Sequence, residues 1–285
     1  MSTMVVALLR EVFFGDESDG RLGRLLAEAR QKGAELVVLP ELAHLPWRPA
    51  FREAVRGDAE PLRGRTFERL SKAARFEAVA VLGGAIVVDE ANGQRYNTAL
   101  LLDQYGELVA SYRKLHLPDE PGFYEADHYA PGDGIPRVVE QFPLRLGVQI
   151  CSDVNRPEGS HILAAMGAEV LLCPRATEAR TFPRWRTVLT ANAITSSCYV
   201  LSVPRPRPEF DVPLGGTSIA IAPDGTVLGE SEETLMLVEL ERTCVERARV
   251  SYPGYLAVRS ELYARGWAEV VPAPQPGGEG FGSDT

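Results

Sequence analysis

The hydrophobic positions of this chain follow two spacings that take turns along the sequence. Short uninterrupted apolar runs predict buried strands, and apolar residues three or four positions apart predict helices. The strands predicted from the apolar runs are 5–11, 35–39, 78–82, 85–88, 96–102, 107–114, 144–150, 170–173, 199–203, 217–222 and 226–229. Apolar residues at helical spacing predict helices around 22–29 and 67–74, and two more helices are predicted at 159–166 and 185–197.

Turn residues separate several of these strands. Asn92-Gly93 and the segments 103–106 and 223–225 predict hairpins. Gly83-Gly84 is expected to break the apolar run around it into two strands. Strands joined partly by helices and partly by hairpins predict an α/β protein with mixed sheets covered by helices.

The composition fits one large domain. A chain of 285 residues with 45% hydrophobic content buries a substantial core. Residues 270–285 are rich in proline and glycine and have no apolar period, so we expect a flexible tail there. The functional domain is therefore expected to span 1–269.

Charge and hydropathy narrow the range of partners. The formal net charge is −9, and no cluster of basic residues favours binding to nucleic acid. The start of the chain lacks the pattern of a secretory signal, and the longest uncharged apolar run, 78–88, is too short to cross a bilayer. We expect a soluble cytoplasmic protein.

The four cysteines, Cys151, Cys173, Cys198 and Cys244, lie far apart. A disulfide framework is not expected without a secretory signal, and C-x-x-C motifs for metal or redox chemistry are absent from the sequence. The last three cysteines have apolar neighbours and are expected to be small buried residues. Cys151 has a different setting.

Three polar residues come directly after apolar strands: Glu41, Lys114 and Cys151. In α/β proteins the strand ends converge on the crevice where binding and catalytic sites form, so these side chains are candidates for one site. Each also has an ordinary structural interpretation. Taken alone, they would be a solvated loop glutamate, a surface lysine and a core cysteine.

Together these residues resemble a known family. The segments 39–41 (Leu-Pro-Glu), 112–118 (Tyr-Arg-Lys-Leu-His-Leu-Pro) and 147–153 (Gly-Val-Gln-Ile-Cys-Ser-Asp) strongly resemble the three catalytic blocks of the nitrilase superfamily, the carbon–nitrogen hydrolases. Further segments in family order support the resemblance, which covers almost the whole chain: 122–125, 129–133, 215–218, 223–225 and 259–263. It implies a four-layer α-β-β-α sandwich, no metal or organic cofactor, and a homodimer or larger homo-oligomer.

The resemblance also implies a Glu-Lys-Cys triad, and residue chemistry supports its roles. A thiol attacks only as thiolate, so Glu41 is expected to act as the base for Cys151. Lys114 and the Ser152 amide are expected to stabilise the oxyanion. Glu41 then donates a proton to the leaving nitrogen, and water hydrolyses the thioester.

A second glutamate is implied by the resemblance, and Glu125 stands at its place before Pro131. Its expected role is to position Lys114 and the substrate. Glu120 is the rival in the same loop but falls outside the local pattern. His116 is expected to be a buried structural residue that forms hydrogen bonds.

The residues after the nucleophile indicate the substrate class. Asp153 stands where nitrilases carry Glu, and with Pro157-Glu158 it resembles amidases or N-carbamoyl hydrolases. Arg156 and Arg175 are candidates for binding an anionic group of the substrate through a guanidinium fork. An alternative for each is a surface or ion-paired structural arginine.

The leading interpretation is thus a cysteine hydrolase of non-peptide C–N bonds in a small amide or N-carbamoyl compound. Two alternatives stay open. One is a nitrilase that converts a nitrile to an acid and ammonia by the same triad. The other is a non-catalytic binding or scaffold module that retains the fold.

Overall fold

The computed structural model describes residues 2–15 and 18–270. One compact unit spans Met1–Tyr255, and a second begins at Leu256 and contains the helix α7 (Ser260–Glu269). The tail expected at 270–285 lies outside the described residues apart from Val270.

Sheet 1 has six strands and carries two of the three predicted site residues at its strand ends. β1, β2 and β3 are parallel, and the remaining neighbours pair antiparallel. In spatial order the strands are β13 (Leu235–Glu241), β1 (Thr3–Leu9), β2 (Leu36–Val38), β3 (Ala80–Val88), β4 (Arg95–Leu102) and β5 (Leu108–Arg113).

Sheet 2 has five strands, of which β8, β9 and β10 are parallel and the others antiparallel. In spatial order they are β12 (Val227–Ser231), β11 (Ser218–Ile221), β10 (Tyr199–Pro204), β9 (Val170–Arg175) and β8 (Leu146–Val148). Both sheets are mixed, as the combination of helical and hairpin connections predicts.

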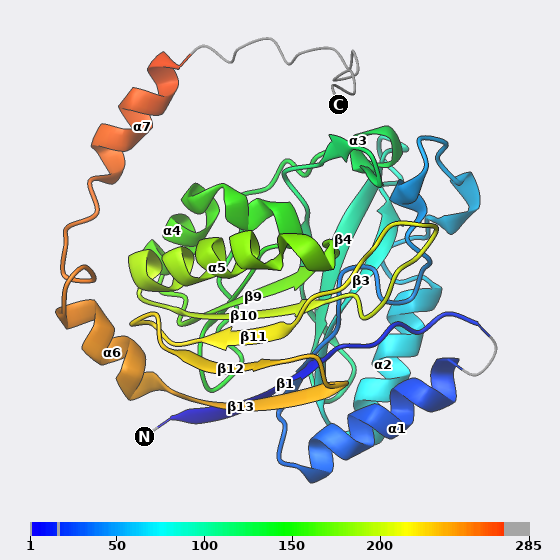
Figure 1. Ribbon diagram of the computed structural model, residues 1–285, viewed down its shortest axis with the longest axis horizontal. Coiled ribbons are helices and arrows are strands. Elements are labelled where there is room, and N and C mark those ends of the chain that lie inside the picture. Colours follow the sequence, from blue (N-terminus) through cyan, green and yellow to red (C-terminus); the bar gives the residue numbers. More distant parts are fainter. Residues whose placement is uncertain (1, 16–17, 271–285) are drawn as a thin grey trace. The chain divides into compact units, whose positions relative to one another are not determined.

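Two helices cover the outer face of each sheet (Figure 1). α1 (Ser18–Gln31) and α2 (Arg65–Glu77) bury their apolar stripes against sheet 1, forming one core layer. α4 (Pro157–Ala165) and α5 (Phe182–Ser196) do the same against sheet 2. The predicted four-layer α-β-β-α architecture is therefore confirmed.

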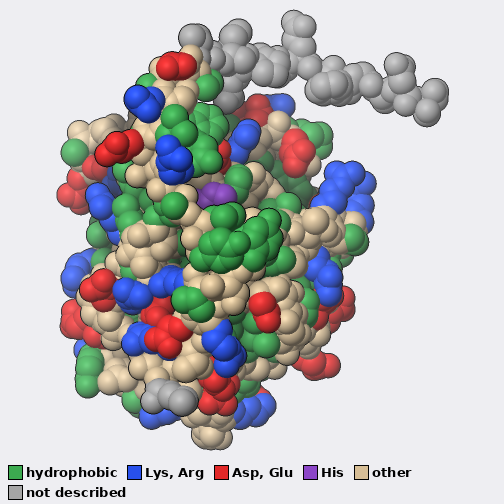
Figure 2. Space-filling model, turned by 90° about the vertical axis from the view of Figure 1, so that its left-hand side faces the viewer, with side chains coloured by type: hydrophobic (Ala, Val, Ile, Leu, Met, Phe, Trp, Pro, Cys, Tyr) green, Lys and Arg blue, Asp and Glu red, His purple; other side chains and the backbone are tan. Residues whose placement is uncertain are grey.

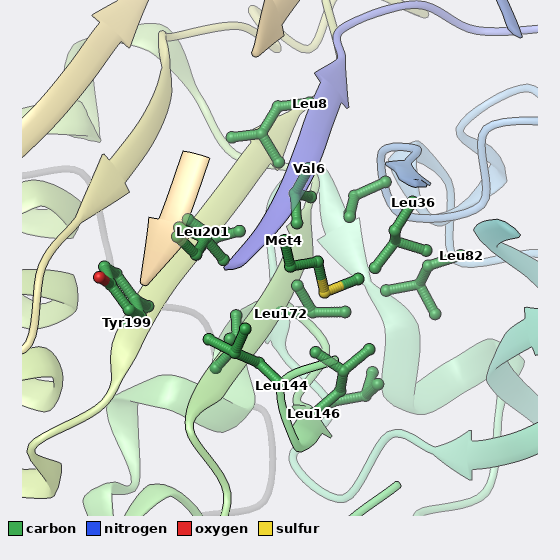
Figure 3. Close-up of a cluster of buried hydrophobic side chains, with 14 of the residues drawn as sticks. Met4, Val6, Leu8, Leu36, Leu82, Leu144, Leu146, Leu172, Tyr199 and Leu201 are labelled. Atoms are coloured by element: carbon green, nitrogen blue, oxygen red, sulfur yellow. The ribbon is translucent and has the colours of Figure 1, made fainter. Parts of the chain in front are cut away.

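The central core fills the space between the two sheets. Figure 3 shows Met4, Val6 and Leu8 of β1 in this cluster with Leu172 of β9 and Leu201 of β10. Strands such as β2 and β9 are buried along their whole length because helices cover one face and the other sheet covers the second. This explains their continuous apolar runs.

The remaining elements are short or lie outside the layers. They are η1 (Arg48–Ala50), η2 (Arg56–Asp58), β6 (Asp119–Glu120), β7 (Phe123–Tyr124), α3 (Glu125–His128), η3 (Cys151–Asn155), η4 (Ala179–Thr181) and α6 (Arg242–Val250).

The expected break at Gly83-Gly84 is wrong, because β3 runs without interruption through both glycines. The two glycines allow neighbouring segments to approach the strand closely. A Cβ on Gly83 would lie 2.7 Å from a methyl carbon of Leu70 in α2, and one on Gly84 would lie 3.1 Å from the backbone nitrogen of Leu42. Glycine in a strand thus marks the sites where a helix and a loop pack directly on the sheet.

The surface agrees with the charge pattern of the sequence. On the face shown in Figure 2, Lys and Arg side chains are interspersed with Asp and Glu. No helix in the described part of the chain is long and apolar enough to cross a membrane.

Candidate active site

The three predicted catalytic side chains are all buried, and each follows a strand. Glu41 comes three residues after Val38, the last residue of β2, Lys114 directly follows β5, and Cys151 opens η3 after β8. Sheet 1 contributes the first two residues, and sheet 2 contributes the third. The site therefore lies where the strand ends of the two sheets meet.

Lys114 is at the centre of a buried charge cluster. Its Nζ donates to Glu41 Oε1 at 2.8 Å and to Glu125 Oε1 at 2.6 Å. The lysine and Glu41 side chains have no solvent exposure, and Glu125 has 1%. Burial alone would lower the Lys114 pKa, but Glu125 and Glu41 raise it well above its ordinary value. Lys114 is therefore a permanent cation.

Two neutral groups complete the environment of Glu41. Asn97 of β4 donates from Nδ2 to Glu41 Oε1 at 2.7 Å and lies 3.4 Å from Glu125 Oε2. The backbone N–H of Ala176 donates to Glu41 Oε2 at 2.8 Å. Both Glu41 oxygens thus have fixed partners, which sets the orientation of the carboxylate.

Ala176 also connects Glu41 to Cys151. The Cys151 thiol donates to the Ala176 carbonyl oxygen at 3.4 Å, on the same residue whose N–H binds Glu41. Cys151 is 4% exposed and has a φ of 47°, in the left-handed region that non-glycine residues rarely adopt. Backbone strain is common where a side chain must be aimed at a reaction centre.

The thiol is neutral at rest. Burial raises the pKa of Cys151 well above its ordinary value, and the nearby Glu41 carboxylate raises it further, while Lys114 opposes them. A thiol of this kind could act as a nucleophile only with a base that takes its proton during attack.

Glu125 opens the short helix α3 and is buried beside Lys114, whereas its rival Glu120 is exposed in β6. Burial raises the pKa of Glu125 to about 7; Lys114 lowers it and the like charge of Glu41 raises it. Near neutral pH the two carboxylates therefore begin to take up one proton.

Asp153 is a buried carboxylate that ties the two catalytic strand ends together. Its Oδ1 accepts from the backbone N–H groups of Leu115 and His116, at 3.1 and 2.9 Å, directly after the lysine. Its Oδ2 accepts from Tyr112 Oη at 2.8 Å and from the N–H of Ile150 at 3.1 Å, directly before the cysteine. This structural role of Asp153 was not predicted, because the residues that it joins are distant in the sequence.

The loop after Glu41 is held by a buried arginine from the far end of β10. Arg205 donates to the carbonyl oxygens of Glu41 and Leu42 at 2.9 Å each and to Leu45 at 2.8 Å. Glu209 accepts from the same guanidinium at 2.7 Å and neutralises its charge. Neither residue could be predicted from the sequence, because Arg205 lies 164 positions from Glu41 and gives no local signal.

Ser152 and His116 are both at the edge of the site. As the second residue of η3, Ser152 has a backbone N–H without an intrahelical acceptor. Its hydroxyl donates to the His116 carbonyl oxygen. His116 binds Asp153 through Nδ1 at 2.9 Å, but its side chain is 44% exposed, so the expectation of a buried histidine is wrong.

The two arginines predicted to bind an anion differ in accessibility. Arg156 is exposed between η3 and α4. Arg175 is fully buried and donates to neutral oxygens of Ser202, Thr177 and Thr217, the shortest at 2.6 Å. Neither is in contact with the Lys114 cluster through a hydrogen bond or ion pair described here, and their substrate role stays a prediction.

Comparison with known proteins decides the family. The family model described as carbon-nitrogen hydrolase matches residues 20–250. The chain belongs to the carbon–nitrogen hydrolase family. It is a hydrolase of C–N bonds other than peptide bonds, in the amidase-like branch of the nitrilase superfamily.

Curated relatives and solved structures agree with this assignment. Omega-amidase NIT2 of Xenopus tropicalis is 31% identical over 257 residues, covering 87% of this chain and 91% of that protein. The chloroplastic omega-amidase of Arabidopsis thaliana is 33% identical over 84% of this chain and 68% of that protein. The carbon–nitrogen hydrolase of Helicobacter pylori G27 shares the fold, with a TM-score of 0.84 at 22% identity over 94% of this chain and 100% of that one.

Among residues 2–15 and 18–270, no group of three or more His, Cys, Asp or Glu side chains is placed to hold a metal ion. The expectation that this hydrolase needs no metal or organic cofactor stays a prediction. All four cysteines are free, with Cys173 and Cys198 buried and Cys244 only partly so.

Replacing Asp153 with asparagine should weaken both the fold and the reaction. Five N–H and O–H groups point at the Asp153 carboxylate, and the amide group of Asp153→Asn would replace one acceptor oxygen with a further donor. We therefore expect a loss of about 2–4 kcal/mol in the free energy of unfolding. Misplacement of the catalytic strand ends should lower kcat at least about tenfold. Urea denaturation and initial rates measure the two effects. Tyr112→Phe, the matched control, removes a single donor and should cost only about 1 kcal/mol.

The fall of kcat/KM at low pH should follow the protonation of Glu125. Because the pKa of Glu125 is about 7, its charge is present above that pH and lost below it. We expect kcat/KM to fall up to about tenfold per unit as pH drops below about 7. Glu125→Gln, fixed in the neutral state, should be slow at pH 8 and lack this limb, whereas the exposed Glu120→Gln should match the wild type. An unchanged limb near pH 7 in Glu125→Gln would contradict this role.

Proposed function

We propose that this hydrolase cleaves small amides or N-carbamoyl compounds through a thioester on Cys151, with Glu41 as acid and base and Lys114 as oxyanion stabiliser. The observation that carries the proposal is the Ala176 backbone, whose N–H binds Glu41 and whose carbonyl accepts the Cys151 thiol. It couples the nucleophile to a carboxylate that also contacts the buried Lys114.

In the first half-reaction, the thiol proton passes to Glu41 as Sγ attacks the substrate carbonyl carbon. The neutral thiol described above makes this transfer necessary. The oxyanion that forms is stabilised by the Lys114 ammonium and the Ser152 N–H. Glu41 then gives its proton to the nitrogen, the C–N bond breaks, and ammonia or an amine leaves.

In the second half-reaction, water attacks the thioester carbon and its proton passes to Glu41. The same cation and N–H stabilise the new oxyanion. When the C–S bond breaks, Glu41 returns its proton to sulfur, and a carboxylic acid leaves. Glu125 remains a positioning residue, because its contacts are to Lys114 and Asn97 rather than to the thiol.

The substrate pocket is proposed to be lined by an apolar cluster beside Glu41. Leu42 directly follows Glu41, and the backbone N–H of Ala176 donates to Glu41. Leu42 and Ala176 belong to a buried cluster with Trp47, Phe123 and Tyr129. The Tyr129 hydroxyl is buried and has no hydrogen-bond partner among the described residues. An apolar wall with one free hydroxyl suits a compact substrate with few polar atoms.

The relatives named omega-amidases favour an amide as substrate, and we propose an amide or ureide rather than a nitrile. A homodimer or larger homo-oligomer and a cytoplasmic location belong to the same proposal, and both rest on the sequence alone.

A screen of ammonia release from ω-amides, N-carbamoyl amines, N-carbamoyl amino acids and nitriles tests the function. We expect turnover of the first three classes in preference to nitriles, and none by Cys151→Ala. Brief exposure to a slow amide should add an acyl group to the Cys151 peptide in the intact enzyme. Glu41→Gln should lower kcat at least about a hundredfold, while Cys173→Ala should keep the rate. An adduct on another cysteine would overturn the assignment of the nucleophile.

An anionic substrate group would be recognised by Arg156 or Arg175. Arg175 would have to leave its three partners to reach a substrate, whereas Arg156 is exposed already. The test is to measure kcat/KM for a substrate with a terminal carboxylate and for its methyl counterpart, in the wild type, Arg156→Ala and Arg175→Ala. A guanidinium contact should favour the carboxylate at least about tenfold, and one variant should lose that preference. Equal rates for the pair in the wild type would exclude an anion site and leave the triad untouched.

A further inference from the structure

A cavity of about 300 Å³ lies between the two sheets, away from the catalytic residues. It is at the side of the sandwich where β5, the edge strand of sheet 1, faces β8, the edge strand of sheet 2. The residues that line it include neither Glu41, Lys114 and Cys151 nor Glu125. The cavity thus shares no proposed catalytic residue with the candidate active site, and Tyr112, which donates to Asp153, lies in the lining of the cavity.

The inner wall of the cavity is apolar. It continues the central core, since its residues also belong to the inter-sheet cluster or pack against it: Leu82, Ala99, Leu101, Ala110, Val139 and Val148. At the roughly 30 Å³ that one water occupies in the liquid, the volume is enough for about ten non-hydrogen atoms. Apolar surroundings of this kind hold water poorly and favour an apolar occupant.

The outer part of the cavity carries charges of both signs, and one of its guanidiniums, Arg137, has no ion pair of its own among the described residues. Arg113 is held by Asp89 at 2.8 Å and lies 3.8 Å from Asp133, whose side chain is 84% exposed and strongly hydrated. Arg137 also lines the cavity and has no ion-pair partner within 4.0 Å in the described ranges. A guanidinium next to an apolar cavity matches a ligand with a carboxylate at one end.

We propose that this cavity is a second ligand site, which binds a small monocarboxylate with an unbranched aliphatic chain of about six to eight carbons. The chain fills the apolar space between the sheets, and the carboxylate pairs with Arg137. The size of the cavity sets the length of the chain, and the Arg137 guanidinium selects the head group. The site does not depend on the proposed reaction, since it shares no catalytic residue with it.

Isothermal titration of the wild-type enzyme with hexanoate and octanoate tests the proposal, with 1-hexanol as the neutral counterpart. We expect saturable binding of one carboxylate per chain, at least about tenfold tighter than that of the alcohol. Arg137→Gln should weaken carboxylate binding at least about tenfold. Arg30→Gln, an exposed arginine on α1, is the matched control and should bind like the wild type.

Two cavity-filling variants show where the ligand binds. Ala110→Phe enters from β5 and Val139→Phe from the opposite wall, so both should abolish binding if the ligand occupies this cavity. Unchanged binding in folded Ala110→Phe or Val139→Phe would place the ligand elsewhere and overturn the proposal. Equal affinity for hexanoate and 1-hexanol, an unaffected Arg137→Gln variant, or no saturable binding up to tens of millimolar would overturn it as well. Because Arg137 is exposed, its variant tests the proposal even if a filled cavity prevents folding.

Discussion

The burial of one ammonium group is the constraint on which the site depends. A lysine charge without solvent is tolerated only when carboxylates neutralise it and accept hydrogen bonds from it. Lys114 has Glu41 on one side and Glu125 on the other. Two carboxylates and one ammonium leave a surplus negative charge, and the N–H groups of Asn97 and Ala176 solvate that charge in place of water. Removing water in this way is also what makes a fixed cation effective against a developing oxyanion.

Such a cluster holds its geometry only if the backbones that carry it are fixed, and residues distant in sequence do this. Asp153 collects donors from both catalytic strand ends, so the end of β5 and the start of η3 share one carboxylate. Arg205, neutralised by Glu209, fixes the loop after Glu41 from the other sheet. The hydrogen bonds of Asp153 and of Arg205 both join segments of different sheets, so the geometry of the site depends on how the two sheets pack together.

The sequence predicts the local elements and the catalytic blocks well, because both depend on residues close together in the chain. Apolar period and turn chemistry locate the layered strands and helices except β13, whose partner β1 lies at the opposite end of the sequence. The same limit explains why Asn97, Asp153 and Arg205 are absent from the predicted site or appear there in another role. Asn97 is a single polar residue inside the apolar strand β4, and its role becomes clear only from its hydrogen bond to the buried Glu41. At Gly83-Gly84 a local signal is misleading, because the glycine pair predicts a break in the strand but instead allows a helix and a loop to pack on the sheet.

The neutral state of the buried thiol has a further consequence. Peroxides and disulfides react with thiolates, so a cysteine kept protonated and 4% exposed is a slow target for sulfenic acid formation. In the proposed reaction, the proton leaves sulfur as the thiol attacks the substrate carbonyl carbon. The burial that makes a partner base necessary in the proposed reaction therefore also slows oxidation of the Cys151 thiol between turnovers.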